Sequence, residues 1–266
     1  MIEGVLIGIT VIIIAVVVLS LLLVFVEYVY VFIFSKPIYV HFYLKLKKLP
    51  HAQLTFLKQH SQYYRRLPLK KQEYFEHRTA EFLANYKFVS RQGALIDNEL
   101  KVAVASAYIT LSFGMRNYLS NSFTTILIYP DSYLSTQKNQ MHDGEFSPQY
   151  KAVVFSRKAL LEGFNNGNDN LNLAIHEFAH VLTYHSIKKR DVSASIFSDQ
   201  YHNIISKITQ PINAEMLKNS NYFRIYAFTN QYEFVAVILE HFFETPQQFE
   251  RQFPDLYKDV KKMINQ

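Results

Sequence analysis

An uninterrupted apolar run near the start of this 266-residue chain limits its fold more than any other feature. Residues 5–26 carry no charged side chain and consist mainly of valine, isoleucine and leucine. At about 1.5 Å per residue, a helix over this run would be roughly 33 Å long, which is enough to cross a hydrocarbon core of about 30 Å. Such a helix has no polar side to turn toward water, so the run predicts a membrane span.

A buried core helix and a cleaved signal peptide are the two alternatives to a permanent anchor. Signal peptides open with Lys or Arg and end in small residues. Here Glu3 is the only charged residue before the run, and bulky residues such as Tyr28 and Tyr30 follow it. The chain is therefore expected to keep a single-pass anchor over residues 1–34, which contacts membrane lipid through residues 5–34.

Basic residues flank the apolar run on one side only. Lys36, Lys45, Lys47 and Lys48 follow the run, and no Lys or Arg precedes it. By the positive-inside rule, the remainder of the chain is expected in the cytoplasm. The absence of cysteine is compatible with that reducing compartment. The four lysines supply much of the net charge of +6 and can lie on anionic lipid, so no nucleic-acid partner is expected.

The rest of the sequence contains both helical and strand patterns. Apolar and polar residues alternate over 37–49, which indicates a strand or a segment on the membrane surface, within a connector expected at 35–54. Helices are expected at 70–88, 97–113, 230–244 and 247–264, and strands at 123–129 and 150–155. Helices before and after a short sheet predict one α+β domain over residues 55–266.

His176, Glu177 and His180 form a His-Glu-x-x-His sequence on an expected helix. Histidines four residues apart project from one face of a helix, where both imidazoles can bind one metal ion. Glu177 can then reach a water molecule on that ion. Asp169 or Asn170, at the end of a loop rich in turn formers, is the expected N-cap of this helix. A surface helix with two solvated histidines is the alternative interpretation.

A catalytic zinc site needs a third protein ligand and leaves its fourth position to water. Ser186 stands ten residues after the first histidine, where a third histidine would complete one well-known arrangement. Glu233 is the best candidate, because a carboxylate at the start of an otherwise apolar helix is costly unless it is paired or binds metal. Stabilisation by the helix dipole is the alternative explanation for this residue. Glu240, two turns further on, is a candidate to hydrogen-bond a ligating imidazole.

Several segments in combination resemble the Mlc titration factor A family of bacterial zinc metallopeptidases. They are ILIYPDSYL at 126–134, VVFS at 153–156, HEFAH at 176–180, YEFVAVILEHFF at 232–243 and FPDLY at 253–257. The resemblance covers roughly residues 70–260 and leaves out the apolar run. Because the catalytic core of that family is similar to the protease domain of anthrax lethal factor, the resemblance implies a zincin-like metallopeptidase fold for the α+β domain.

The resemblance also implies roles for individual residues. His176, His180 and Glu233 would bind one Zn²⁺ per chain. Glu177 would be the general base that activates the zinc-bound water, and Tyr226 would stabilise the oxyanion. The implied substrate is a peptide or a protein.

Two positions depart from the family pattern. Thr183 stands where the family usually has Asp, three residues after the second histidine, and Arg157 stands where it usually has Trp. These changes leave the expected metal ligands intact and concern substrate preference and the residues that surround the ligands. Two functions are therefore considered: a membrane-anchored zinc-dependent peptidase, and a membrane-tethered zinc-containing binding module that sequesters a transcriptional regulator.

Overall fold

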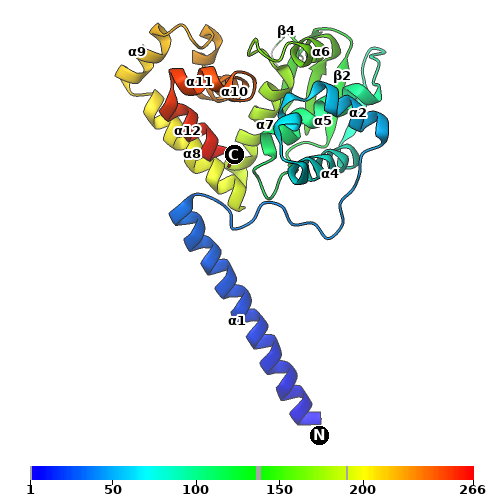
Figure 1. Cartoon of the computed structure of the whole chain (residues 1–266), viewed down its shortest axis with the longest axis vertical. Coiled ribbons are helices and arrows are strands. Elements are labelled where there is room, and N and C mark those ends of the chain that lie inside the picture. The colour runs from blue at the N-terminus through cyan, green and yellow to red at the C-terminus, as the bar shows by residue number, and fades with distance from the viewer. Residues whose placement is uncertain (1, 136–138, 190) are drawn as a thin grey trace. The chain divides into compact units, whose positions relative to one another are not determined.

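The computed structural model describes residues 2–135, 139–189 and 191–266 (Figure 1). It divides the chain into two compact units, Met1–Val40 and His41–Gln266. The first unit contains helix α1, Ile2–Phe34. Among the described residues, α1 is the one helix long and apolar enough to cross a membrane, a property that membrane anchors share with signal sequences.

The second unit is an α+β fold that is mostly helical and contains a small mixed sheet. Its helices are α2 His51–His60, α3 Gln62–Arg66, α4 Leu69–Asn85, α5 Asn98–Ser112, α6 Arg157–Asn165, α7 Leu173–Lys188, α8 Val192–Ile208, α9 Pro211–Asn219, the 3₁₀ helix η1 Ile225–Phe228, α10 Gln231–Glu244, α11 Pro246–Gln252 and α12 Pro254–Met263. Its strands are β1 Lys87–Ser90, β2 Thr125–Tyr129, β3 Tyr133–Leu134, β4 Met141–His142, β5 Gly144–Ser147 and β6 Ala152–Ser156.

The main sheet has the strand order β1-β2-β6-β5. Strands β1, β2 and β6 are parallel, whereas β5 runs antiparallel to β6 and ends the order. The register pairs Gly144 of β5 with Phe155 of β6. A separate antiparallel pair, β3 and β4, precedes β5 directly in the chain.

Helix α7 lies at the centre of the second unit, between the part that contains the sheet, α4 and α5 and the part that contains α8, α10 and α12 (Figure 1). Its Phe178 is fully buried, with ring centres 5.0 Å from Tyr108 of α5, 5.5 Å from Phe155 of β6 and 6.1 Å from Phe82 of α4. Another side of α7 packs against α10. Burial of apolar rings thus fixes the orientation of α7, and with it the direction of its histidines.

Most expected helices and strands are present, and the differences have local causes. The helix expected at 70–88 ends at Asn85, because Phe88 pairs with Ile126 in β1, a strand the sequence had not suggested. Pro254 divides the helix expected at 247–264 into α11 and α12, since proline forces the residue before it out of the helical conformation. Residues 37–49 form no strand, so their alternative, a segment on the membrane surface, stays a prediction.

Candidate metal centre

Side chains from two helices converge at one point. His176 and His180 come from α7, and Glu233 comes from the first turn of α10. Nε2 of His176 lies 3.2 Å from Nε2 of His180 and 2.9 Å from Oε2 of Glu233, and Nε2 of His180 lies 3.4 Å from that oxygen. Two atoms that are each about 2.0 Å from a tetrahedral zinc ion are about 3.3 Å apart. The three atoms therefore have the chemistry and the spacing of a zinc site with one position open.

The start of α7 is set by Asn172, whose side-chain oxygen accepts a hydrogen bond from the backbone of Ile175 at 3.1 Å. The expectation that Asp169 or Asn170 caps this helix is therefore wrong. Asn170 has a left-handed φ of 58°, and Asp169 accepts a bond from Leu171 N within the preceding turn.

Glu233 occupies the first turn of α10 because Asn230 caps that helix. The Asn230 side chain accepts bonds from Tyr232 N at 2.9 Å and Glu233 N at 3.1 Å. The helix dipole is favourable for a carboxylate at this position, as the alternative interpretation required. The carboxylate nevertheless contacts both histidines, so the dipole is not its only partner.

Glu240 orients the imidazole of His176 from behind. Its Oε1 lies 2.7 Å from Nδ1 of His176, and its side chain is only 1% exposed. Arg224 Nη2 is also 3.3 Å from Nδ1, but a guanidinium has only donors, so the Nδ1 proton must go to Glu240. Nε2 is then left with a free lone pair directed at His180 and Glu233, as in the carboxylate–histidine–metal arrangement.

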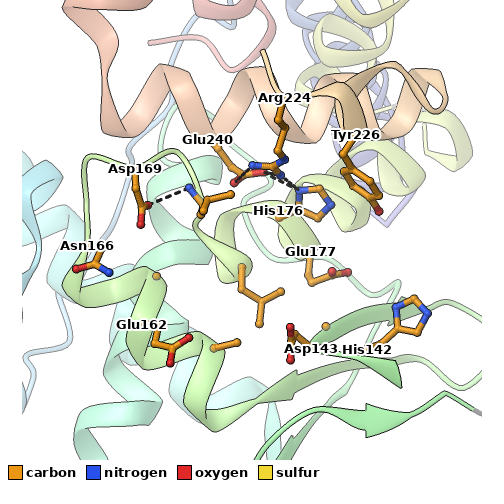
Figure 2. A pocket seen from close by; sticks show the side chains of 15 residues that line it. His142, Asp143, Glu162, Asn166, Asp169, His176, Glu177, Arg224, Tyr226 and Glu240 are labelled. Atoms are coloured by element: carbon orange, nitrogen blue, oxygen red, sulfur yellow. Dashed lines mark hydrogen bonds and ion pairs between the residues drawn. The ribbon is translucent and has the colours of Figure 1, made fainter. Parts of the chain in front are cut away.

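Arg224 and the chain before α7 hold the Glu240 carboxylate in place. Arg224 donates from Nη2 to Oε1 at 2.7 Å and from Nη1 to Oε2 at 3.1 Å (Figure 2). Asn172 N also donates to Oε2, at 3.1 Å. Arg224 also donates to the carbonyl oxygen of Asn170 at 2.6 Å. The buried charge of Glu240 is thus compensated on both oxygens.

A second buried carboxylate, Glu244, lies one turn after Glu240 on α10. Its Oε2 accepts from Asn170 N at 2.7 Å and its Oε1 accepts from Asn172 Nδ2 at 3.1 Å. Burial raises the pKa of Glu244 to about 7, against the effect of these hydrogen bonds. The two glutamates together fasten α10 to the chain segment that starts α7.

Without an ion, the carboxylates favour a proton on His176. Burial lowers the pKa of His176, but hydrogen bonds to Glu233 and Glu240 outweigh burial and raise it to about 10. Burial likewise opposes ionisation of Glu233, yet the two histidines hold its pKa well below the ordinary value. A proton and a metal ion therefore compete for the same nitrogen.

A cavity of about 460 Å³ opens beside these residues. His176, Glu177, Arg224, Tyr226 and Glu240 line one side of it, and His142, Asp143 and Glu162 line the other (Figure 2). The floor includes Gly144 of β5, where an added Cβ would lie 2.8 Å from Cγ of Glu177. Glycine at this position lets the strand and the glutamate approach each other closely.

Tyr226 lies in η1 and faces the same cavity (Figure 2). Its ring centre is 6.0 Å from that of His176. Burial, followed by the charge of Glu233, raises the pKa of Tyr226 to about 12. The hydroxyl therefore keeps its proton at neutral pH and can donate a hydrogen bond into the cavity.

The residues singled out from the sequence thus lie together, although His180 and Glu233 are not among the residues that line the cavity. His176, His180 and Glu233 form a group whose ligand atoms lie within 4.8 Å of one another. Glu177 and Tyr226 line the cavity, and Glu240 contacts His176. The sequence does not predict Arg224, Asn172 or Glu244 as site residues, although Asn172 is a typical N-cap residue directly before α7 and Glu244 lies four residues after Glu240.

Comparison with known families agrees with this centre. The family model described as glucose-regulated metallo-peptidase M90 matches residues 41–264. The chain belongs to this family. Together with relatives named Mlc titration factor A, this match confirms the resemblance to that family. Helix α1 lies outside the matched region.

The M90 chain has curated relatives in several bacteria. It is 23% identical over 237 residues to the uncharacterized protein slr2042 of Synechocystis sp., and the alignment covers 80% of this chain and 82% of the relative. It is 23% identical over 207 residues to Mlc titration factor A of Pectobacterium atrosepticum, covering 70% of this chain and 76% of the relative. The Yersinia pestis protein of the same name is 23% identical over 206 residues, covering 70% and 74%.

Proposed function

We propose that this M90 protein is a membrane-anchored zinc-dependent peptidase. The main support is the spacing of His176, His180 and Glu233, which fits a tetrahedral ion with one open position. The position of Glu177 and Tyr226 on the wall of the adjoining cavity adds to it, because a purely structural metal site needs neither residue.

Zn²⁺ held by these three side chains would supply a Lewis acid and lower the pKa of a water molecule at the open position to about 7. Glu177 accepts a proton from the attacking water and delivers it to the leaving nitrogen of the peptide bond. Tyr226 donates a hydrogen bond to the carbonyl oxygen as negative charge develops there, a contribution of about 3 kcal/mol in comparable sites. Arg224 and Glu240 keep the His176 ring in position.

The sheet offers a place for an extended substrate. β5 ends the strand order of the main sheet and carries Gly144, which contacts Glu177 and lines the cavity. A peptide that pairs with a strand at the edge of a sheet gains main-chain hydrogen bonds that do not depend on its sequence. This geometry would bring a peptide bond next to Glu177.

Substitution of the general base tests the chemistry. Glu177→Gln in the full chain should keep one Zn²⁺ per chain, because Glu177 is not a ligand, and should lose peptide hydrolysis. Zinc content and cleavage of a mixed peptide library are measured on the same preparation, with chelator-treated wild type as the control. Full turnover by Glu177→Gln would remove Glu177 from the role of base.

The second candidate is a membrane-tethered zinc-containing binding module that sequesters a transcriptional regulator. It is favoured by the name of the relatives, Mlc titration factor A, which refers to titration of another factor. Such a module would bind its regulator equally well after Glu177→Gln, and wild type would cleave no peptide in the library. The same pair of proteins therefore separates the two candidates.

We further propose that α1 remains in the mature protein as a single-pass anchor, with the catalytic unit in the cytoplasm. The exposed apolar surface of α1 and the lysines after it support this orientation. A permanent anchor should resist alkaline extraction from membranes and leave the protein at its full length. A shortened, extractable product would indicate a signal peptide.

A further inference from the structure

The segment between α1 and α2 exposes large apolar side chains. Residues 41–48 belong to the second unit, where Phe42 is 73% exposed and Leu44 is 97% exposed. Lys45 and Lys48 are exposed beside them, and the segment contains no acidic residue. A surface that combines exposed apolar groups with uncompensated positive charge is typical of a site that contacts a membrane or another protein.

The opposite side of this segment is fixed to α4. The His41 ring stacks on Tyr74 with 4.8 Å between centres, and the Tyr43 ring lies edge-on to His77 at 4.3 Å. Lys47 N donates to Nδ1 of His77 at 2.9 Å. The inward residues thus hold the segment in one shape, and that shape directs Phe42 and Leu44 outward.

A third inward contact comes from Arg78, which is fully buried and donates from Nε to the Tyr43 hydroxyl at 2.5 Å. The Lys47 ammonium pairs with Glu81 at 2.7 Å, so its charge is compensated within the fold. Lys45 and Lys48 have no carboxylate within ion-pair distance among the described residues. Their charge is available to an anionic partner.

Chain length limits the distance between this segment and the end of α1. Leu44 follows Phe34, the last residue of α1, by ten positions. An extended chain covers at most about 3.6 Å per residue, so Leu44 stays within about 36 Å of the helix end. If α1 spans the bilayer, that end lies at the level of the lipid headgroups.

We propose that Phe42, Leu44, Lys45 and Lys48 form a membrane-docking surface that binds anionic phospholipid. Apolar side chains of this kind enter the boundary between headgroups and acyl chains, and lysines bind the anionic groups above it. The surface would hold the catalytic unit at a fixed distance from the bilayer instead of leaving it on a free tether. The proposal rests on the proposed anchor and does not depend on peptidase activity.

Because the chain has no cysteine, single labels can be placed without background. Leu44→Cys and Ile212→Cys are each made in the full chain, labelled with a nitroxide and reconstituted in vesicles with and without phosphatidylserine. Ile212 of α9 is the matched control, an apolar side chain that is 82% exposed in the same unit. Accessibility to oxygen, which concentrates in lipid, is compared with accessibility to a water-soluble nickel chelate.

The label at 44 should favour oxygen and the label at 212 should favour the nickel chelate. Lys45→Glu combined with Lys48→Glu should return the label at 44 to water in the phosphatidylserine vesicles. Equal nickel accessibility at 44 and 212 in chains that float with the vesicles would overturn the docking surface and leave the anchor intact. Chains that do not float with the vesicles would refute the anchor, and with it the docking surface. Neither result bears on the proposed peptidase activity, which is tested by peptide hydrolysis.

Discussion

Replacing Arg224 by methionine should weaken zinc binding without removing a ligand. The substitution deletes both hydrogen bonds from Arg224 to Glu240, at 2.7 and 3.1 Å, and leaves those from His176 and Asn172. Hydrogen bonds to charged groups contribute about 1.5–3 kcal/mol. Loss of partners behind a metal ligand lowers metal affinity about 10–100-fold, or about 1.4–2.7 kcal/mol. We therefore expect a zinc dissociation constant raised by one to two orders of magnitude.

Competition with a chromophoric chelator measures this change, and Arg157→Met is the matched control. Arg157 has the same side-chain exposure, 29% against 28%, and also pairs with a carboxylate, Asp97, at 3.2 Å. The Arg157 variant should bind zinc like wild type. The visible spectrum of the cobalt-substituted protein should change in Arg224→Met only, because it reports ligand geometry and not overall stability.

A double-mutant cycle shows whether Arg224 acts through Glu240. If it does, Arg224→Met should have little further effect on zinc affinity in a Glu240→Gln background. Equal zinc affinity of wild type and Arg224→Met, or full additivity of the two substitutions, would refute this reasoning. A KM increase confined to substrates with a free C-terminal carboxylate would instead make Arg224 a substrate-binding residue.

Three other substitutions test separate parts of the centre. Tyr226→Phe should lower kcat about 10²–10³-fold with unchanged zinc affinity, and unchanged kcat would exclude the hydroxyl from oxyanion binding. Gly144→Ala places a Cβ 2.8 Å from Glu177 Cγ and should reduce kcat, whereas Gly167→Ala, where a Cβ meets no atom within 4 Å, should not. Because burial raises the pKa of Glu244 to about 7, the folded chain holds its proton more tightly than the unfolded chain. The free energy of unfolding should then fall by up to about 3 kcal/mol between about pH 4.5 and 7. Glu244→Gln should remove that fall, as measured by urea titration at several pH values. A pH profile that Glu244→Gln leaves unchanged would contradict the raised pKa of Glu244.

The two histidines of the candidate metal centre were predictable because their geometry is local. His176 and His180 belong to one helix, so a spacing of four residues suffices to place them together. Glu233 needed an argument about the cost of a carboxylate in an apolar helix. Tyr226 lies in a 3₁₀ helix of four residues, which has too few residues to show a periodic pattern, and only the family resemblance indicated it.

Residues whose roles depend on contacts between distant segments could not be predicted. Arg224 reaches Glu240 only because η1 packs against α10, and Asn172 donates to Glu240 and Glu244 only because its loop meets α10. Strand β1 could not be predicted for the same reason, since Phe88 belongs to a strand only through its pairing with β2. The α+β class was predictable, because it depends on the order of helical and strand patterns and not on these contacts.

His176 and Glu233, two residues of the candidate metal centre, are 57 positions apart in the chain. An ion bound to both would join α7 to α10 and close the intervening chain, including α8 and α9, into a loop. Closing a loop of this length restricts the unfolded chain, as a disulfide does in proteins that contain cysteine. In a chain without cysteine, zinc would then serve as the removable cross-link of the fold, and its loss would loosen the α8–α9 region together with the active site.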